Sequence, residues 1–421
     1  MKNLGIIAEY NPFHNGHKYH LEESKMITGC DRSICVMSGN FLQRGEPAIF
    51  DKWLRAEIAV RNGIDLVFEL PFAYACNNAE YFAKGAVGLL NSLGCVSDLS
   101  FGSETGEIRS LEQAAQAMMD EGPDYSESIR RELKSGVSYA KARYESYRNL
   151  MGEHAAAALN NPNNILAVEY IRQCMVLNSD MKLNTIKRTG AGYSEKNIQG
   201  NIASATAIRH MMLEESKPIE ELSSVIPIET IMAIQSGFSG KLTVWEDFHT
   251  LIAYKIISSS HAELNGIFSI TEGLENRIKK AVRKSSSVRD LIKGIKSKRY
   301  TETRIQRILI HMLLGLTREK MQNMSGKALY ARVLAMNENG AAILKDIRNS
   351  ECASIPILTN INREADKYPD IGELLDLDIL ASDIYNLAGS KPIHMNSDHV
   401  KKPYYQSIQD IKQKRIEKNH F

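Results

Sequence analysis

Two histidines stand three positions apart near the start of the chain, in the stretch Asn11-Pro12-Phe13-His14-Asn15-Gly16-His17. The stretch follows an apolar, strand-like segment and precedes a helical pattern. A helix N-terminus presents free backbone N–H groups and the positive end of the helix dipole, which suits a phosphate chain. Gly16 lets backbone and ligand approach closely. Both imidazoles could donate hydrogen bonds to the charge that develops as pyrophosphate leaves. The pattern therefore favours adenylyl transfer from ATP, with His14 and His17 as the catalytic residues.

Two other interpretations of this loop remain open. The histidines could form half of a metal site with His20 as a third ligand, but no acidic ligand is placed with them. They could also do no more than cap the helix. The alternative phosphate-binding patterns GxxxxGK[ST] and GxGxxG after a strand are missing. We expect no metal ligands from protein side chains.

Two further polar segments follow predicted strands. Ser38, Asn40, Gln43 and Arg44 come after the second strand and could bind an anionic second substrate. Arg44 could instead pair with a neighbouring carboxylate. The second segment opens a helix after the last predicted strand, and we predict phosphate contacts there from Ser204, Thr206 and Arg209. Plain N-capping by the hydroxyl groups is the alternative.

The elements that must position these residues are those of an α/β domain. Short apolar runs predict parallel strands at 4–10, 33–38, 65–70, 96–101 and 182–187. Helical patterns lie between them at 17–26, 52–62, 79–93, 110–120 and 165–176. This alternation is typical of a Rossmann-like five-stranded parallel sheet covered by helices. In such sheets ligands bind outside the carboxyl ends of the strands, where the polar segments lie.

The second half of the chain is predicted to be mainly α-helical. A turn cluster near Gly237 suggests a boundary between an ATP-binding domain at 1–237 and a helical domain at 238–421. Between Arg277 and Arg307 the chain carries 12 Lys and Arg against two acids, in a protein whose net charge is +2. Such an imbalance is typical of binding to a nucleic-acid backbone. A solvated lysine-rich helix face is the simpler alternative.

A second basic cluster lies near the C-terminus. Lys401 and Lys402 precede two tyrosines, and further cations follow at Lys412, Lys414, Arg415 and Lys418. The tyrosine rings could stack on a nucleobase that has left its helix.

Composition excludes several classes of protein. With 43% hydrophobic and 24% charged residues, 421 residues are enough for a globular protein with two or three cores. Apolar runs stay shorter than the roughly 18 to 20 residues of a membrane span, so we expect a cytoplasmic protein that does not bind membranes. The six cysteines are scattered without a CxxC pair, which favours buried free thiols.

Longer strings around the loop carry a resemblance to a known family. His14-Asn15-Gly16-His17 resembles the HxGH signature of the nucleotidyltransferase superfamily. The strings Glu9–His17 and Met37–Ala48 resemble the bacterial tRNA(Met) cytidine acetate ligase family, over nearly the full length of the chain. Ala8 departs slightly, since a β-branched residue would be typical of that strand. Members of the family use ATP as co-substrate to form acetyl-adenylate from acetate. They then acetylate the wobble cytidine of elongator tRNA(Met), which yields N4-acetylcytidine.

The resemblance implies a set of site residues in this chain. Mg²⁺ would be held mainly by phosphates and water. With acetate and tRNA as substrates, we take the loop residues Ser38, Asn40, Gln43 and Arg44 as candidates for acetate. The basic stretch offers Lys279, Lys280, Arg283 and Lys284 as possible tRNA contacts, both sets being chosen from residue type and charge. No obligate protein partner is inferred. The implied ATP-binding residues are Ile7, Ala8, Glu9, Tyr10, Asn11, Pro12, Phe13, His14, Asn15, Gly16, His17, Lys18, Tyr19, His20, Gly102, Asn163 and Arg188.

Two other functions stay open on the residues alone. An adenylyltransferase acting on a mononucleotide or phosphopantetheine would explain the first half of the chain but would leave the basic half without a task. A decayed enzyme that only binds RNA is the other. The two histidines, the Gly16 turn and the arginines argue against it.

Overall fold

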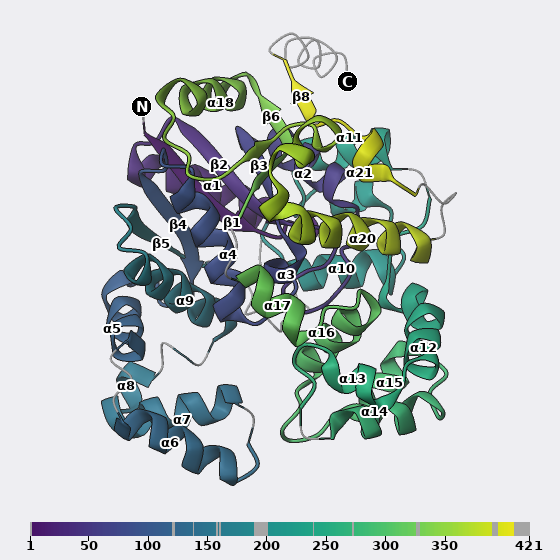
Figure 1. The fold of residues 1–421 in the computed structure, drawn as a ribbon. Helices are drawn as coiled ribbons and strands as arrows, with labels where there is room; N and C mark the ends of the chain where they lie inside the picture. Colours follow the sequence, from purple (N-terminus) through teal and green to yellow (C-terminus); the bar gives the residue numbers. More distant parts are fainter. Residues whose placement is uncertain are drawn as a thin grey trace.

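The computed structural model describes residues 2–119, 123–137, 139–156, 159, 161–188, 201–238, 240–271, 273–325, 329–389 and 395–407. Figure 1 shows a central sheet wrapped by helices, with a group of helices from the middle of the chain set beside it. The N-terminus and the last described strand lie toward the same end of the molecule.

All five predicted strands are present and parallel. Their order in the sheet is β5-β4-β1-β2-β3. The structure gives their bounds as β1 Asn3–Ala8, β2 Arg32–Ser38, β3 Leu66–Leu70, β4 Asp98–Ser103 and β5 Lys182–Lys187. β2 and β3 are buried throughout, which explains their continuous apolar runs, because both faces of the sheet are covered.

The sheet has three further strands that the sequence did not predict. β6 (Ala331–Asn337) runs antiparallel to β3, while β7 (Ile357–Leu358) and β8 (Tyr404–Gln406) pair with β6 in parallel. The five expected parallel strands are thus extended, and among the described residues the sheet has eight strands. β6 was missed because it is a single strand among helices, and β7 and β8 are too short to show a period. The division into domains at 1–237 and 238–421 stays a prediction, although the second half adds strands to this sheet.

Two apolar cores lie on opposite faces of the sheet. Along β2, Ile34 and Val36 belong to one core, and Cys35 and Met37 belong to the other, since successive side chains of a strand point to opposite faces. The first core packs under α4 (Ala79–Ser92), α5 (Ile108–Met119) and α9 (Pro162–Val176), and the second under α1 (Asn15–Thr28), α2 (Lys52–Arg61) and α11 (Ile228–Gly237). These helices include all five that the sequence predicted.

The remaining helices fall into groups along the chain. Three helices between β4 and α9 were not predicted: α6 (Pro123–Lys134), α7 (Tyr139–Met151) and α8 (Glu153–Ala156). The shorter ones include α3 (Phe72–Ala75), α10 (Ala205–Leu213), α19 (Ile361–Glu364) and α21 (Ser397–Val400). The basic half holds α12 (His249–Ser258), α13 (His261–Gly266), α14 (Leu274–Val282), α15 (Val288–Ile295), α16 (Glu302–Leu313) and α17 (Arg318–Ser325). They are followed by α18 (Glu338–Ser350) and α20 (Gly372–Ala388).

The helical group packs against loops at the carboxyl edge of the sheet. Gly45, with φ 90°, lies in the loop after β2, and a Cβ there would come within 2.5 Å of the Arg307 nitrogen on α16. His311 of α16 bonds the Cys76 carbonyl through Nε2 at 2.7 Å, just after β3 and α3. The loop after β2 therefore lies between the sheet and α16.

A buried group of four charges joins the C-terminal segment to the sheet. Lys52 Nζ lies 2.7 Å from both Glu69 Oε1 and Asp398 Oδ2. Arg332 Nη1 lies 2.8 Å from the same Asp398 oxygen. Lys52 and the side chain of Asp398 have no exposed surface. These residues come from α2, β3, β6 and α21, so the cluster ties the first and last parts of the chain together.

Candidate active site

The site forms where the sheet order changes direction. From β1 the chain proceeds to β2 and β3 on one side, and β4 and β5 lie on the other. Ligands of such sheets bind in the crevice at the carboxyl ends of the strands at this position. α1 starts there, directly after β1, and its first turn carries both predicted histidines.

The backbone fixes both imidazole rings. His14 is the N-cap of α1, and its Nδ1 accepts the Gly16 N–H at 3.0 Å. His17 Nδ1 accepts the His14 N–H at 3.2 Å, and the two rings stack with centroids 3.8 Å apart. A neutral imidazole that accepts at Nδ1 carries its proton on Nε2. Each ring therefore has one N–H left to donate to a ligand.

Both histidines are held neutral. Burial lowers the pKa of His14 to about 3, and the positive charges of Arg188 and Arg209 act in the same direction. Burial also lowers the pKa of His17 far below its usual value, with His14 and Arg188 as further causes. His20 shares this environment: burial and Arg188 lower its pKa to about 4. The site thus combines neutral N–H donors with fixed guanidinium charges.

Two of the predicted nucleotide contacts, Gly102 and Arg188, lie together across the crevice. A Cβ on Gly102 of β4 would come within 3.3 Å of Arg188 Cγ. The Arg188 N–H donates to the Ser103 carbonyl at 2.9 Å, so its side chain starts at the edge of β4. The structure thus brings Gly102 and Arg188 together at the end of β4, and their contacts with ATP stay predictions.

Asn163 stands at the start of α9, on the other side of β4. Its Nδ2 donates to Glu104 Oε1 at 2.7 Å, and the Asn164 N–H donates to Glu104 Oε2 at 3.1 Å. These bonds hold the loop after β4 against the N-terminus of α9. Asn163 is thus at the same edge as the histidines, and a contact with ATP stays a prediction.

The turn before α10 supplies a second arginine. Ser204 caps α10 by accepting the Ala207 N–H at 3.1 Å, so the capping alternative for this residue is present. Arg209 Nη1 donates to the Asn11 carbonyl at 3.0 Å, and its Nη2 lies 3.4 Å from Thr206 Oγ1. Its charge is partly balanced by Glu46, at 3.5 Å. Arg209 thus contacts the HxGH loop itself, and the phosphate contacts of the three residues stay predictions.

In the loop proposed for the second substrate, the polar side chains of Asn40 and Gln43 form hydrogen bonds within the protein. Asn40 Oδ1 accepts the Lys52 N–H at 2.7 Å, and its Nδ2 donates to Ser382 at 3.3 Å. Gln43 donates from Nε2 to the Asn77 carbonyl at 2.9 Å. Ser38 Oγ is buried and has no partner among the residues that the structure describes. Ser38 and the partly exposed Arg44 are therefore the groups best placed to meet an anion.

Arg55, which sequence reasoning did not assign to the site, and Glu9, which it assigned to ATP, both hold the loops of the site in place. Arg55 is fully buried on α2 and donates to the carbonyls of Glu9, Ser38 and Gly39, at the ends of β1 and β2. The Glu9 carboxylate accepts the Gln43 N–H at 2.7 Å, and burial raises its pKa. The one available signal was an arginine inside an otherwise apolar helix face.

Three of the four predicted RNA-binding cations are exposed, and the fourth, Lys279, is bonded within the protein. Lys280, Arg283 and Lys284 are exposed at the end of α14. Lys279 Nζ instead donates to the carbonyls of Ile257 (3.2 Å) and Ser259, which ties α14 to α12. The three exposed cations remain available to an anionic partner.

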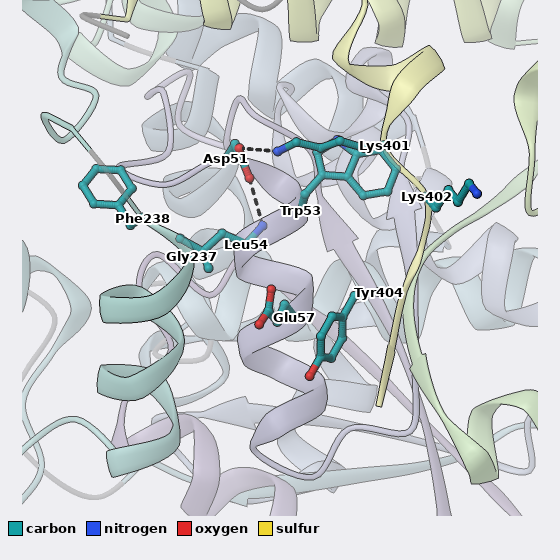
Figure 2. A pocket seen from close by; sticks show the side chains of 9 residues that line it. All are labelled: Asp51, Trp53, Leu54, Glu57, Gly237, Phe238, Lys401, Lys402 and Tyr404. Atoms are coloured by element: carbon teal, nitrogen blue, oxygen red, sulfur yellow. Dashed lines mark hydrogen bonds and ion pairs between the residues drawn. The ribbon is translucent and has the colours of Figure 1, made fainter. Parts of the chain in front are cut away.

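The second basic cluster lies beside α2. A hollow of about 260 Å³ lies there, and Lys401 Nζ lies 2.9 Å from Asp51 Oδ2 at its edge. Figure 2 shows that Lys401 points toward Asp51, while Lys402 points away from it. Tyr405 is exposed, but the Tyr404 ring lies 5.8 Å from the Arg61 guanidinium. Lys412, Lys414, Arg415 and Lys418 lie outside the described residues.

Within the described ranges, His, Cys, Asp and Glu side chains form no group of three that could hold a metal ion. None of the helices described here is both long and apolar enough to cross a membrane.

Comparisons with known proteins agree with this geometry. A family model described as HIGH Nucleotidyl Transferase matches residues 1–399. The tRNA(Met) cytidine acetate ligase of Thermoanaerobacter sp. (strain X514) is 43% identical over 388 residues, covering 91% of this chain and 95% of that protein. The protein of the same name from Acetivibrio thermocellus is 39% identical over 407 residues, covering 93% and 96%.

Two solved structures of Thermotoga maritima TmcAL are similar over almost the whole chain. The apo form has a TM-score of 0.89 at 34% identity and covers 97% of this chain and 100% of that one. The form bound with alpha-thio ATP has a TM-score of 0.87 at 33% identity, with the same coverage.

Proposed function

This chain belongs to the tRNA(Met) cytidine acetate ligase family of HIGH nucleotidyl transferases, and we propose that it uses ATP to acetylate the wobble cytidine of elongator tRNA(Met). In the first step acetate attacks the α-phosphorus of ATP, which yields acetyl-adenylate and pyrophosphate. In the second step the cytidine N4 amine attacks the acetyl carbonyl, and AMP leaves. The products are N4-acetylcytidine, AMP and pyrophosphate.

The pair of neutral histidines at the start of α1 carries this proposal. Their Nε2–H groups remain free to donate to a ligand, and the guanidinium groups of Arg188 and Arg209 are close enough for their charges to lower the pKa of His14. Such an arrangement stabilises negative charge that grows on a departing pyrophosphate. Because the rings are stacked and bonded to the backbone, they need little reorganisation when the charge develops.

The remaining roles follow from position. We assign the segment from Ile7 to His20, with Gly102, Asn163 and Arg188, to ATP. Mg²⁺ would neutralise the triphosphate and be held mainly by phosphate oxygens and water. Ser38 and Arg44 are assigned to acetate, supported by the buried and unpartnered Ser38 hydroxyl. Lys280, Arg283 and Lys284 would bind the tRNA backbone.

A reconstituted reaction tests the function. The protein is incubated with ATP, Mg²⁺, acetate and unmodified elongator tRNA(Met), and N4-acetylcytidine and pyrophosphate are measured. Both products are expected. AMP transfer to a mononucleotide or to phosphopantetheine, with no acetylcytidine, would contradict the proposal.

The role of His17 is tested in the first step alone. His17→Ala removes one donor to the leaving group, so we expect acetate-dependent pyrophosphate formation to fall about 10²- to 10³-fold. Binding of tRNA should stay close to that of the unchanged protein, since the basic helices are untouched. A fully active variant would rule out the proposed role.

A further inference from the structure

Arg307 of α16 is a partly buried arginine that faces the loop after β2. Its Nη1 lies 3.3 Å from the Gln43 carbonyl oxygen, and the backbone of α16 at Arg307 packs directly on Gly45. The N–H of the same Gln43 donates to Glu9 at the end of β1. One residue of the loop therefore separates this guanidinium from the strand that leads into the HxGH loop.

The surroundings of Arg307 are positive. Within the part of the chain that the structure describes, no ion pair reaches it. Burial is the main cause that lowers the pKa of Arg307 to about 10, and the nearby charges of Arg304 and Arg44 act in the same direction. A partly buried guanidinium beside two others, with no carboxylate pair of its own, is unfavourable until an anion binds.

We propose that Arg307, with Arg304 beside it on α16, binds a backbone phosphate of the acceptor RNA next to the nucleotide that is acetylated. This site rests on the proposed function and extends it by one contact close to the chemistry. Arg304 and Arg307 are the last cations of the basic stretch that begins at Arg277, and Lys280, Arg283 and Lys284 are exposed earlier in it. An RNA backbone bound along these helices would therefore reach the loop after β2 at Gln43.

Two groups of arginines serve two anions in this arrangement. Arg188 and Arg209 act on the pKa of His14, which places them at the α1 crevice proposed for ATP. The charges that act on Arg307 are those of Arg304 and Arg44, on the side of the loop that faces the helical group. Arg188 and Arg209 can neutralise the triphosphate at α1. Arg307 on α16 can therefore bind the second polyanion in the reaction, which is the RNA.

The test uses the salt dependence of RNA binding. In Arg307→Gln the amide can still donate to the Gln43 carbonyl, but the charge is lost. We expect the Kd for unmodified elongator tRNA(Met) to rise about tenfold or more. The slope of log K against log salt concentration should become shallower by about 0.7 to 0.9, as expected for one lost phosphate contact. Pyrophosphate formation from ATP and acetate without tRNA should be unchanged.

Two further variants sharpen the result. Arg307→Lys keeps the charge but not the fork of donors, so the slope should return while the affinity recovers only in part. Arg348→Gln is the matched control, because Arg348 is exposed on α18, a helix that Figure 1 shows well apart from α16. The slope of this variant should equal that of the unchanged protein.

Several outcomes would overturn the proposal. An unchanged slope in Arg307→Gln would mean that no phosphate contact was lost. A raised KM for acetate or ATP with unchanged tRNA binding would assign Arg307 to one of those substrates. Failure of the proposed function looks different: the unchanged protein would bind this tRNA and form no N4-acetylcytidine, whatever the slope of the variant.

Discussion

In both histidines of the HxGH loop the backbone occupies Nδ1, which leaves Nε2 as the nitrogen that can donate to a ligand. His14 accepts the N–H of Gly16, and His17 accepts the N–H of His14. Low pKa values keep both rings uncharged at neutral pH. The rings therefore contribute directed hydrogen bonds, while the arginines contribute the positive charge.

The buried histidines should make the protein sensitive to acid. His14 has a pKa of about 3 when folded against about 6.5 when unfolded. Between these values the unfolded chain binds a proton that the folded chain does not, so the free energy of unfolding falls as pH falls below about 6.5. The contribution of one such histidine is at most about 1.4 kcal/mol per pH unit.

Urea denaturation between about pH 7 and pH 5 measures this effect. In His14→Asn the group that takes up the proton is absent, so the loss of stability over this range should be smaller than in the unchanged protein. Equal losses in the two proteins would mean that His14 takes up its proton at the same pH in the folded and unfolded states, which would contradict the lowered pKa.

Residue types at strand ends could be read from the sequence, but their partners could not. Gly102 and Arg188 were both assigned to ATP from motif positions, and they lie together in the structure. Arg55 and Arg307 were not assigned to the loop after β2. Arg55 donates to the Ser38 carbonyl and Arg307 to the Gln43 carbonyl. Every residue has a backbone carbonyl group, so no pattern in the sequence predicts which carbonyl an arginine will bind.

At the scale of elements, position 16 in the first turn of α1 has no room for a side chain. A Cβ on Gly16 would lie 2.9 Å from His14 Cε1 and 3.0 Å from Nδ1. We expect Gly16→Ala to displace the His14 ring and to slow acetate-dependent pyrophosphate formation by about tenfold or more. Because alanine favours helices, the free energy of unfolding should change by less than about 1 kcal/mol.

Gly372→Ala is the control for this substitution. Gly372 is the first residue of α20, and a Cβ there meets no atom within 4 Å. Activity and stability should both stay close to those of the unchanged protein. Full activity in Gly16→Ala would show that the His14 ring tolerates the added methyl group.

Strands that are buried on both faces were predictable, whereas strands that complete the sheet were not. β2 and β3 are continuous apolar runs flanked by turns and helical patterns, and both were predicted within two residues. β6 carries Arg332 as its second residue, and a charged side chain does not indicate a buried strand as long as its partners are unknown. Asp398 and Glu69 neutralise this arginine, and Asp398 lies far away in sequence.

At the scale of the whole molecule, the buried charge cluster ties the C-terminal segment to the sheet. Asp398→Ala would leave Lys52 and Arg332 buried with Glu69 as their one remaining carboxylate. We expect a loss of about 3 to 5 kcal/mol in the free energy of unfolding, measured by urea denaturation. Lys401→Ala removes a partly exposed ion pair three residues later and should cost less than about 1 kcal/mol. Similar losses in the two variants would contradict this account.

The basic helices should bind tRNA without taking part in the first chemical step. We expect replacement of Lys280, Arg283 and Lys284 by glutamate to weaken tRNA binding on the order of a hundredfold at moderate salt. Acetate-dependent pyrophosphate formation without tRNA should stay unchanged. Lys279 is left out because it bonds the end of α12. Parallel loss of both activities would indicate misfolding and not a binding surface.

The antiparallel pairing of β3 with β6 also constrains how the protein is made. β3 ends at Leu70, and the strand that covers its open side begins at Ala331. During synthesis the ribosome therefore releases an apolar sheet edge long before the segment that closes it. Unpaired edges of this kind are prone to aggregation in incomplete chains. Nascent chains that end before β6 should for this reason depend on chaperones more than the finished protein does.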